Sequence, residues 1–242
     1  MMIVILLLFS CAGGSKTKKT EEKALSIEEH FQLGYSTLER GNLDEAVNEY
    51  KKVLKINPKH AKAHVNLGIA YGRQGKWKEE ISEYKKAIQI DPHFAQAHFN
   101  LGVAYYERGN LNDAMVHYQK VLQLQPNYVE AHNNLGNLYF RKGNLNEALS
   151  EYRKAIEINP TYARGHYNLG NVYRQKGDLE EAIASFQRAL EANPKYAEAH
   201  YGLAVVYGEK QEFKLAIQHC DQAEKLGLSV DPKFLERLKP HR

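Results

Sequence analysis

The chain has 242 residues, of which 33 are Lys or Arg and 29 are Asp or Glu, so its formal net charge is +4. With 43% hydrophobic residues and only 2 cysteines, it is too apolar for a disordered chain and too poor in cysteine for a disulfide scaffold. A weak charge spread along the sequence gives no reason to expect a nucleic-acid partner.

The chain begins with a hydrophobic leader, residues 1–11, that ends in Cys11. Its first nine residues are all apolar. A helix of nine residues is only about 14 Å long, whereas about 20 residues are needed to cross a bilayer. We therefore expect an export signal rather than a membrane-spanning helix. No Lys or Arg precedes Cys11, so two alternatives stay open: a start codon assigned at the wrong place, or a hydrophobic leader without function.

Residues 12–26 are small, polar and charged, and we expect them to form a flexible tether. From residue 27 onward the sequence repeats every 34 residues. Six histidines follow this step: His30, His64, His98, His132, His166 and His200. Such a period is typical of stacked supersecondary units. We expect six units, at residues 27–60, 61–94, 95–128, 129–162, 163–196 and 197–230.

Each unit is expected to form two helices, as the third unit illustrates. Apolar and small residues from His98 to Tyr105 recur with the period of a helix that buries one face. Gly109 is expected to end this helix in the left-handed conformation, and Asn110 to be the N-cap of the next one. Pro126 closes the unit because its ring cannot continue a helix.

The spacing of Leu-Gly, Tyr, Gly, Ala, Tyr or Phe, Ala and Pro in these units resembles the tetratricopeptide repeat (TPR). The resemblance implies an all-α fold, a right-handed α-solenoid of six helix-turn-helix units. The sixth unit departs from the pattern, since Gln211 replaces the helix-ending glycine and Cys220 replaces the aromatic residue. Terminal repeats often differ because one face meets water. We expect residues 231–242 to form a short capping helix and Cys220 to be a buried thiol.

The residues from Leu8 to Cys11 resemble the lipobox of bacterial lipoproteins, in which the cysteine carries the lipid and becomes the mature N-terminus. This resemblance implies lipid attachment at Cys11 and an anchor in the cell envelope. Ala12 favours the periplasmic side of the outer membrane over the inner membrane. Acyl chains contribute roughly 0.8 kcal/mol of membrane binding per buried CH₂. If the leader is not a signal, the protein is expected in the cytoplasm.

The repeated histidines are not expected to bind metal. Neighbouring units pack about 8–10 Å apart, whereas zinc requires three or four ligands at about 2 Å. We expect partly buried imidazoles that bond to neighbouring backbone, and a loss of stability between roughly pH 6 and 4 as acid charges them. The sequence has no P-loop, nucleotide-binding glycine motif, zinc-protease pair or nucleophile elbow. We therefore expect no cofactor, no small-molecule substrate and no enzymatic activity.

The candidate binding residues lie on the face of each first helix opposite its packed stripe. The sixth position of the four central units forms an asparagine row: Asn66, Asn100, Asn134 and Asn168. A carboxamide both donates and accepts, so such a row can hold a peptide backbone. Asparagine is a poor helix former, by about 0.7 kcal/mol relative to alanine, so helix stability does not explain the row. Recent duplication of an idle residue is the alternative. The further candidates are Asn133, Asn137, Asn171, Lys62, Arg164 and Tyr167.

The asparagine row is similar to the asparagine-lined superhelix of O-linked N-acetylglucosamine transferases, where the matching residues hold substrate peptide. Their catalytic domain has no counterpart here, so the resemblance implies peptide binding alone. The clamp by which other TPR proteins bind chaperone tails requires Lys at the fifth and Arg at the sixth position, and no unit has either. We expect a non-catalytic scaffold that binds an extended segment of a partner protein in its concave groove, with an edge or the convex face as the alternative surface.

Two more specific functions stay open. Six TPR units behind a lipobox resemble the pilotin lipoproteins that help to assemble type IV pilus secretins. Alternatively, the protein could hold together an envelope polysaccharide or enzyme complex.

Overall fold

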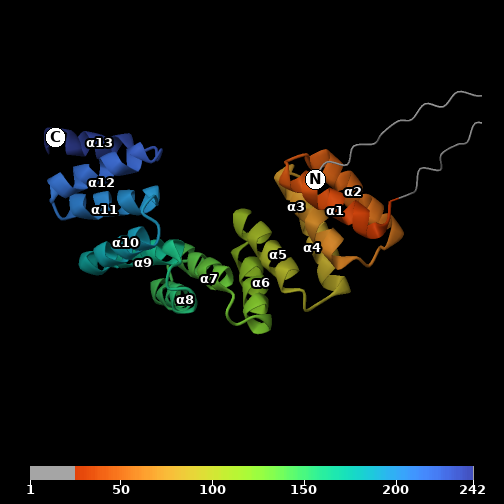
Figure 1. Cartoon of the computed structure of the whole chain (residues 1–242). Coiled ribbons are helices and arrows are strands. Elements are labelled where there is room, and N and C mark those ends of the chain that lie inside the picture. The colour runs from red at the N-terminus through yellow and green to blue at the C-terminus, as the bar shows by residue number, and fades with distance from the viewer. Residues whose placement is uncertain (1–24, 242) are drawn as a thin grey trace, which may run out of the picture.

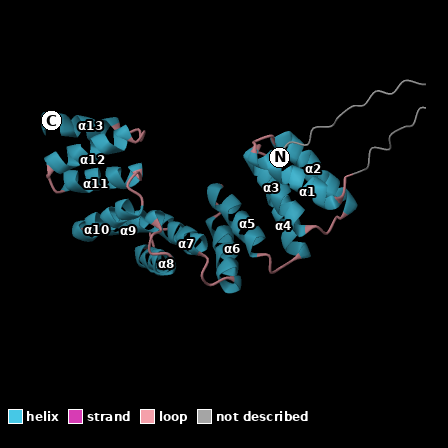
Figure 2. Cartoon of the chain, in the orientation of Figure 1, coloured by secondary structure: helices cyan, strands magenta, loops and turns pink. Residues whose placement is uncertain are grey.

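The structure, a computed structural model, describes residues 25–241, which fold into helices without any strand in that range. Figures 1 and 2 show consecutive helices stacked side by side along a curved array, with α1 and α13 at its two ends. The first helices of the pairs are α1 (Ile27–Glu39), α3 (Ala61–Arg73), α5 (Ala95–Glu107), α7 (Val129–Arg141), α9 (Ala163–Lys176) and α11 (Ala197–Glu209). The second helices are α2 (Leu43–Ile56), α4 (Trp77–Ile90), α6 (Leu111–Leu124), α8 (Leu145–Ile158), α10 (Leu179–Ala192) and α12 (Phe213–Lys225).

The six pairs confirm the predicted α-solenoid, and the chain ends with the short helix α13 (Pro232–Leu238) and the 3-10 helix η1 (Lys239–His241). The predicted leader at 1–11, including Cys11, and all but the last two residues of the predicted tether lie outside the described residues. Within residues 25–241 no helix combines the length and the apolar character that a membrane span requires.

The turn inside each pair has the conformation that the glycine pattern predicts. Gly109 has a φ of 78°, the left-handed region that glycine enters without steric cost, and its counterparts in the other four glycine-containing turns lie between 74° and 84°. In the sixth unit Gln211 adopts the same conformation with a φ of 63°. The departure noted in the sequence therefore leaves the turn geometry unchanged.

The predicted N-caps are correct in position but wrong in mechanism. Asn110 and the residues at the same repeat position, Asn42, Asn144 and Asp178, all occupy N-cap positions, yet none of their side chains makes a capping hydrogen bond. Their ψ angles, near 70°, differ from the extended ψ of a capping residue, because the turn must bring the second helix back against the first. Ser26, with a ψ of 166°, forms a full capping box with Glu29 at the start of α1.

An aromatic ring packs on a glycine inside each of the first five pairs. A Cβ added to Gly102 would lie 2.7 Å from the Tyr118 ring, closer than any real contact, so only glycine lets the two helices approach this far. Tyr118 is fully buried as a result. In the fifth pair the ring is Phe186, which also lies against Gly202 of the next unit. These rings therefore hold each pair together, and Phe186 also joins two units.

The first helices line the inner side of the curve. Each contacts the first helix of the next pair directly, in the sequence α1, α3, α5, α7, α9 and α11. Each of the second helices from α2 to α10 packs between two first helices, as α2 does between α1 and α3, whereas α12 packs against α11 and α13. The sixth repeat position, which carries the asparagine row, therefore belongs to the inner helices.

Candidate functional site

The asparagine row lies half-buried along the inner helices α3, α5, α7 and α9. Asn66 donates from Nδ2 to the hydroxyl of Tyr50, 3.2 Å away on the preceding unit. Burial raises the pKa of Tyr118 two units further along, and the Asn134 carboxamide opposes this effect. Burial raises the pKa of Tyr50 to about 12, so its hydroxyl stays protonated at neutral pH. Tyr50, whose ring holds the first helix pair together, thus also orients Asn66.

Asn168 is oriented by a different set of side chains. Its Nδ2 donates to Asn133 Oδ1 at 2.8 Å and to Asn137 Oδ1 at 3.1 Å. The Tyr152 hydroxyl donates to the same Asn137 oxygen at 2.8 Å. Asn133 is completely buried, which corrects its prediction as a peptide-contacting residue. Its carboxamide oxygen accepts from Asn168 on α9, and its side chain has no exposed surface left for a ligand.

Asn100 has a hydrogen-bond donor without an acceptor in the described residues. Its Oδ1 accepts a hydrogen bond from Gln96 at 2.8 Å, while its buried Nδ2 has no partner in the described part of the chain. A cavity of about 400 Å³ adjoins it, lined by residues of α3, α4 and α5. Buried donors are rarely left without an acceptor in proteins. This nitrogen is therefore a place where a carbonyl oxygen of a ligand would gain a hydrogen bond.

The same cavity contains a buried ion pair that the sequence analysis missed. Glu80 stands at a repeat position that is alanine in the other five units, and it bonds Arg108 at 2.6 Å. Burial raises the pKa of Glu80, and the Arg108 guanidinium opposes this effect. Gly72 makes the room, since a Cβ there would lie 2.7 Å from a Glu80 oxygen. The sequence did contain a signal for this pair, because Glu80 is the one charged residue at a repeat position that is otherwise alanine.

The remaining predicted residues are not brought together into one site. Lys62 and Arg164 are exposed and Asn171 is half-buried. The Tyr167 ring centroid lies 5.7 Å from Phe186 and 5.3 Å from Tyr196, so this tyrosine is packed rather than presented to a ligand. The structure thus leaves the central asparagines, and the cavity beside Asn100, as the candidate site.

Four of the six repeated histidines bond to backbone as predicted. The Nε2 atoms of His64, His98, His132 and His166 lie 2.8–3.2 Å from the carbonyl oxygen of the proline six residues earlier. Three of them, His64, His98 and His132, also have a partner nineteen residues later that the sequence pattern did not reveal, such as Glu83 at 2.6 Å from His64 Nδ1. Within residues 25–241 no cluster of three or more His, Cys, Asp or Glu is arranged to hold a metal ion.

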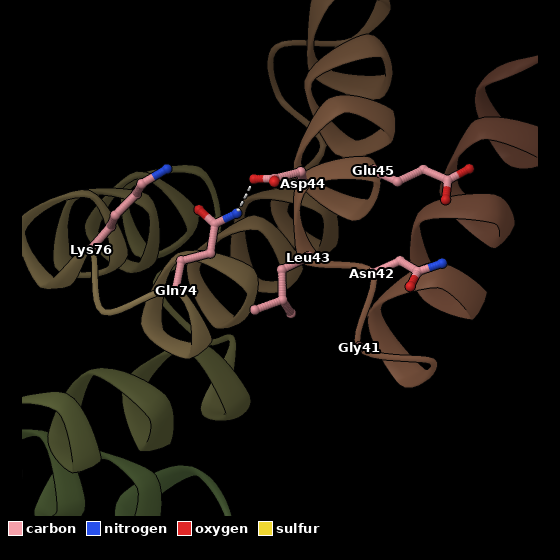
Figure 3. A pocket seen from close by; sticks show the side chains of 7 residues that line it. All are labelled: Gly41, Asn42, Leu43, Asp44, Glu45, Gln74 and Lys76. Carbon is pink, nitrogen blue, oxygen red and sulfur yellow. Dashed lines mark hydrogen bonds between the residues drawn. The ribbon is translucent and has the colours of Figure 1, made fainter.

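A separate hollow of about 720 Å³ lies at the edge of the array, between the turns of the first two units (Figure 3). Gln74 donates to Asp44 there at 2.8 Å, and the two residues are thirty positions apart. Equivalent bonds between neighbouring units join Lys142 to Asn112, Lys176 to Asn146 and Lys210 to Glu180. This edge therefore connects the units, and it lies apart from the asparagine row.

Comparison with known proteins gives a family and a fold. A family model described as a TPR repeat matches residues 34–75, 73–109, 104–143, 136–177 and 170–211. The crystal structure of MamA is 31% identical over 69% of this chain and 97% of that chain, with a TM-score of 0.62. None of the curated proteins matches in sequence.

Two further solved structures are similar in fold alone. PilF of Pseudomonas aeruginosa is 19% identical, over 89% of this chain and 97% of that chain, with a TM-score of 0.77. YrrB, described as a TPR protein with an unusual peptide-binding site, is 21% identical over 79% of this chain and 97% of that chain, with a TM-score of 0.61.

Proposed function

Since the chain belongs to the tetratricopeptide repeat family, a family of protein-interaction scaffolds, we propose that it is a non-catalytic scaffold that binds an extended segment of a partner protein along its inner groove. The observation that carries this proposal is the half-buried asparagine row on the inner helices. The buried Nδ2 of Asn100 strengthens it, because this donor lacks an acceptor that a peptide carbonyl would supply.

The internal hydrogen bonds of the row favour binding. Asn66 and Asn168 are held by Tyr50, Asn133 and Asn137, so their carboxamides lose little conformational freedom when a ligand binds. A binding surface that is ordered beforehand avoids part of the entropy cost of association. A carboxamide can bond the N–H and C=O groups of a peptide backbone, which are the same in every sequence. We therefore expect the affinity to depend weakly on the partner's sequence at these positions.

Replacing Asn66, Asn100 and Asn134 together by alanine should weaken peptide binding by roughly 10- to 1000-fold, since each lost hydrogen bond is worth about 0.5–1.5 kcal/mol. Asn168 is kept, because it holds the buried Asn133. Peptides selected from a random displayed library against the full-length protein serve as probes, and calorimetry measures their affinity. Replacing the exposed Asn48 and Asn127 by alanine gives a matched control, which should bind normally. Equal affinity of the triple variant and the control would move the site away from the row.

We further propose that a lipid on Cys11 anchors the scaffold in a bacterial envelope, at the periplasmic side of the outer membrane. The support is the sequence from Leu8 to Cys11. The Cys11→Ala variant should move from the membrane to the soluble fraction in cell fractionation, with Cys220→Ala, at the other cysteine, as the control. Retention of Cys11→Ala on the membrane would contradict the anchor.

A pilotin-like role in secretin assembly is the second candidate. What favours it is the arrangement of six units behind the lipobox-like leader. It predicts that a strain lacking the gene fails to form secretin multimers. A scaffold for a polysaccharide or enzyme complex predicts normal multimers in that strain.

A further inference from the structure

In three units the repeated histidine contacts a buried glutamate of the second helix. In the second unit Glu83 accepts from His64 Nδ1 at 2.6 Å and from Lys86 Nζ at 2.7 Å. The first and fourth units have the same arrangement, formed by His30, Glu49 and Lys52 and by His132, Glu151 and Lys154. The third and sixth units place a second imidazole there, His117 or His219. In five units the histidine Nδ1 therefore has a partner.

The fifth unit lacks this partner. Ser185 occupies the position of the acid, and its hydroxyl donates to the carbonyl of Glu181 in its own helix. His166 is only 6% exposed and donates from Nε2 to the Pro160 carbonyl, while its buried Nδ1 has no partner in the described residues. At the position of the lysine stands Arg188, which forms no ion pair in residues 25–241.

The missing acid leaves a cavity of about 370 Å³ between α8, α9 and α10. His166 and Ser185 line it together with Leu169, Tyr173 and the two arginines, Arg153 and Arg188. A carboxylate is smaller than this space, so the cavity has room for the acid and for part of the molecule that bears it. The helices involved place the cavity on the outer side of the array, apart from the asparagine row.

We propose that this cavity is a carboxylate-binding site, in which a carboxylate from another molecule bonds His166 Nδ1 and Arg188 as Glu83 bonds His64 and Lys86. The chain itself shows the geometry that the ligand would adopt, because three of its own units hold a carboxylate between the same two repeat positions. Guanidinium and imidazolium donors both make strong charge-assisted hydrogen bonds to carboxylates. This site is independent of the inner groove.

Binding should take up one proton. The Pro160 carbonyl can only accept, so Nε2 of His166 must carry hydrogen, and a carboxylate at Nδ1 requires a second hydrogen on the ring. The other charged groups that line the cavity are Arg153, Arg188, Glu157 and Glu181. Because the bound state holds one more proton than the free state, affinity should rise as pH falls from 8 to 6.

Two sources can supply the carboxylate: an Asp or Glu side chain of a partner protein, or a small free acid. The probes are the peptide acetyl-Gly-Glu-Gly-amide and sodium glutarate, with acetyl-Gly-Gln-Gly-amide and sodium chloride as neutral and salt controls. Full-length protein labelled with ¹⁵N-histidine is titrated at pH 6.5, and the ring nitrogens of His166 are followed by NMR. Tighter binding of the peptide assigns the site to a partner protein, and equal or tighter binding of glutarate assigns it to a free acid.

The variant Ser185→Glu tests the site directly, because it supplies the carboxylate that three of the other units contain at this position. We expect a saturable shift of the His166 signals in the wild type, loss of that shift in Ser185→Glu, and a higher melting temperature for the variant. The exposed substitution Arg188→Gln should weaken binding while leaving the fold intact, so the test does not depend on one variant. Absence of a saturable shift with both acids, or an equal shift in Ser185→Glu and the wild type, would overturn the proposal.

Discussion

Replacing Phe186 by alanine should lower the free energy of unfolding by about 3–5 kcal/mol, the usual cost of removing a large buried aromatic side chain. Phe186 is fully buried. Its ring packs against Gly170 and Gly202, where a Cβ would be 2.7 or 2.8 Å away, and these two neighbours have no side chains to fill the space that the ring would leave. Loss of the Phe186 ring should also let α11–α13 unfold more easily than the other units, because a repeat array is stabilised by contacts between neighbouring units.

Urea denaturation measures the first effect, and hydrogen exchange measures the second. Tyr35→Ala is a suitable control, since Tyr35 is an aromatic residue of an inner helix that is 51% exposed, and its loss should change stability by less than about 0.5 kcal/mol. We expect amides of α11 and α12 in Phe186→Ala to exchange faster than those of α5 and α6. Uniform exchange along the array, or a stability loss no larger than that of the control, would contradict the packing argument.

Lowering the pH from 7 to 4.5 should destabilise the protein, and His117→Glu should remove a large part of this effect. His98 Nδ1 and His117 Nδ1 lie 3.0 Å apart, and His98 Nε2 donates to the Pro92 carbonyl, so two neutral rings satisfy the contact with Nδ1 of His98 as acceptor and Nδ1 of His117 as donor. Burial lowers the pKa of His117 to about 4, and repulsion from a protonated His98 contributes in the same direction. Burial also lowers the pKa of His98.

The direction of this pH effect follows from the number of protons that the folded and unfolded states bind. An unfolded histidine titrates near pH 6.5, whereas folded His117 stays neutral until the pH approaches 4. Between these values the unfolded state binds more protons, so stability is complete above pH 6.5 and is lost as the pH falls through 4. A pKa difference of this size corresponds to about 3 kcal/mol for full loss. The second pair, His200 and His219, adds to the effect in the same direction because burial lowers both pKa values.

Urea titrations at pH 7, 5.5 and 4.5 test this prediction. In His117→Glu a carboxylate would face His98 and Lys120, which reproduces the arrangement of Glu83 with His64 and Lys86. The variant should therefore lose less stability than the wild type over this range. His93→Glu, at an exposed loop position, is the matched control and should behave as the wild type does. Identical pH dependence of His117→Glu and the wild type would show that the buried pair is not responsible.

Much of the fold could be predicted from the sequence because its determinants are periodic. The 34-residue step sets the number of units, and the glycines set the turns: Gly109 has the positive φ that its place in the pattern indicates. The mechanism of helix capping could not be predicted this way. It depends on the ψ angle at Asn110, which is fixed by packing between the two helices rather than by the residue itself.

The candidate site was predicted less completely. Helix geometry placed the asparagine row on one face, but it could not show that Asn133 lies inside, because that depends on how α7 and α9 pack. The partners of the histidines lie on the second helix, nineteen residues later, so no pattern within one helix reveals them. The partners themselves recur every 34 residues, however, as Glu or His. Ser185 is the exception at this repeat position.

Photocrosslinking tests most directly whether the inner groove binds an extended segment. A photoreactive amino acid is placed at the inner positions Val103, Asn137 and Asn171, and at the outer positions Val116 and Ser150. Crosslinked partners are then mapped by mass spectrometry in cells that produce the full-length protein. We predict that the three inner positions crosslink to successive residues of one segment, while the outer positions give no such series. Crosslinks that form from the outer positions alone would contradict the proposed groove.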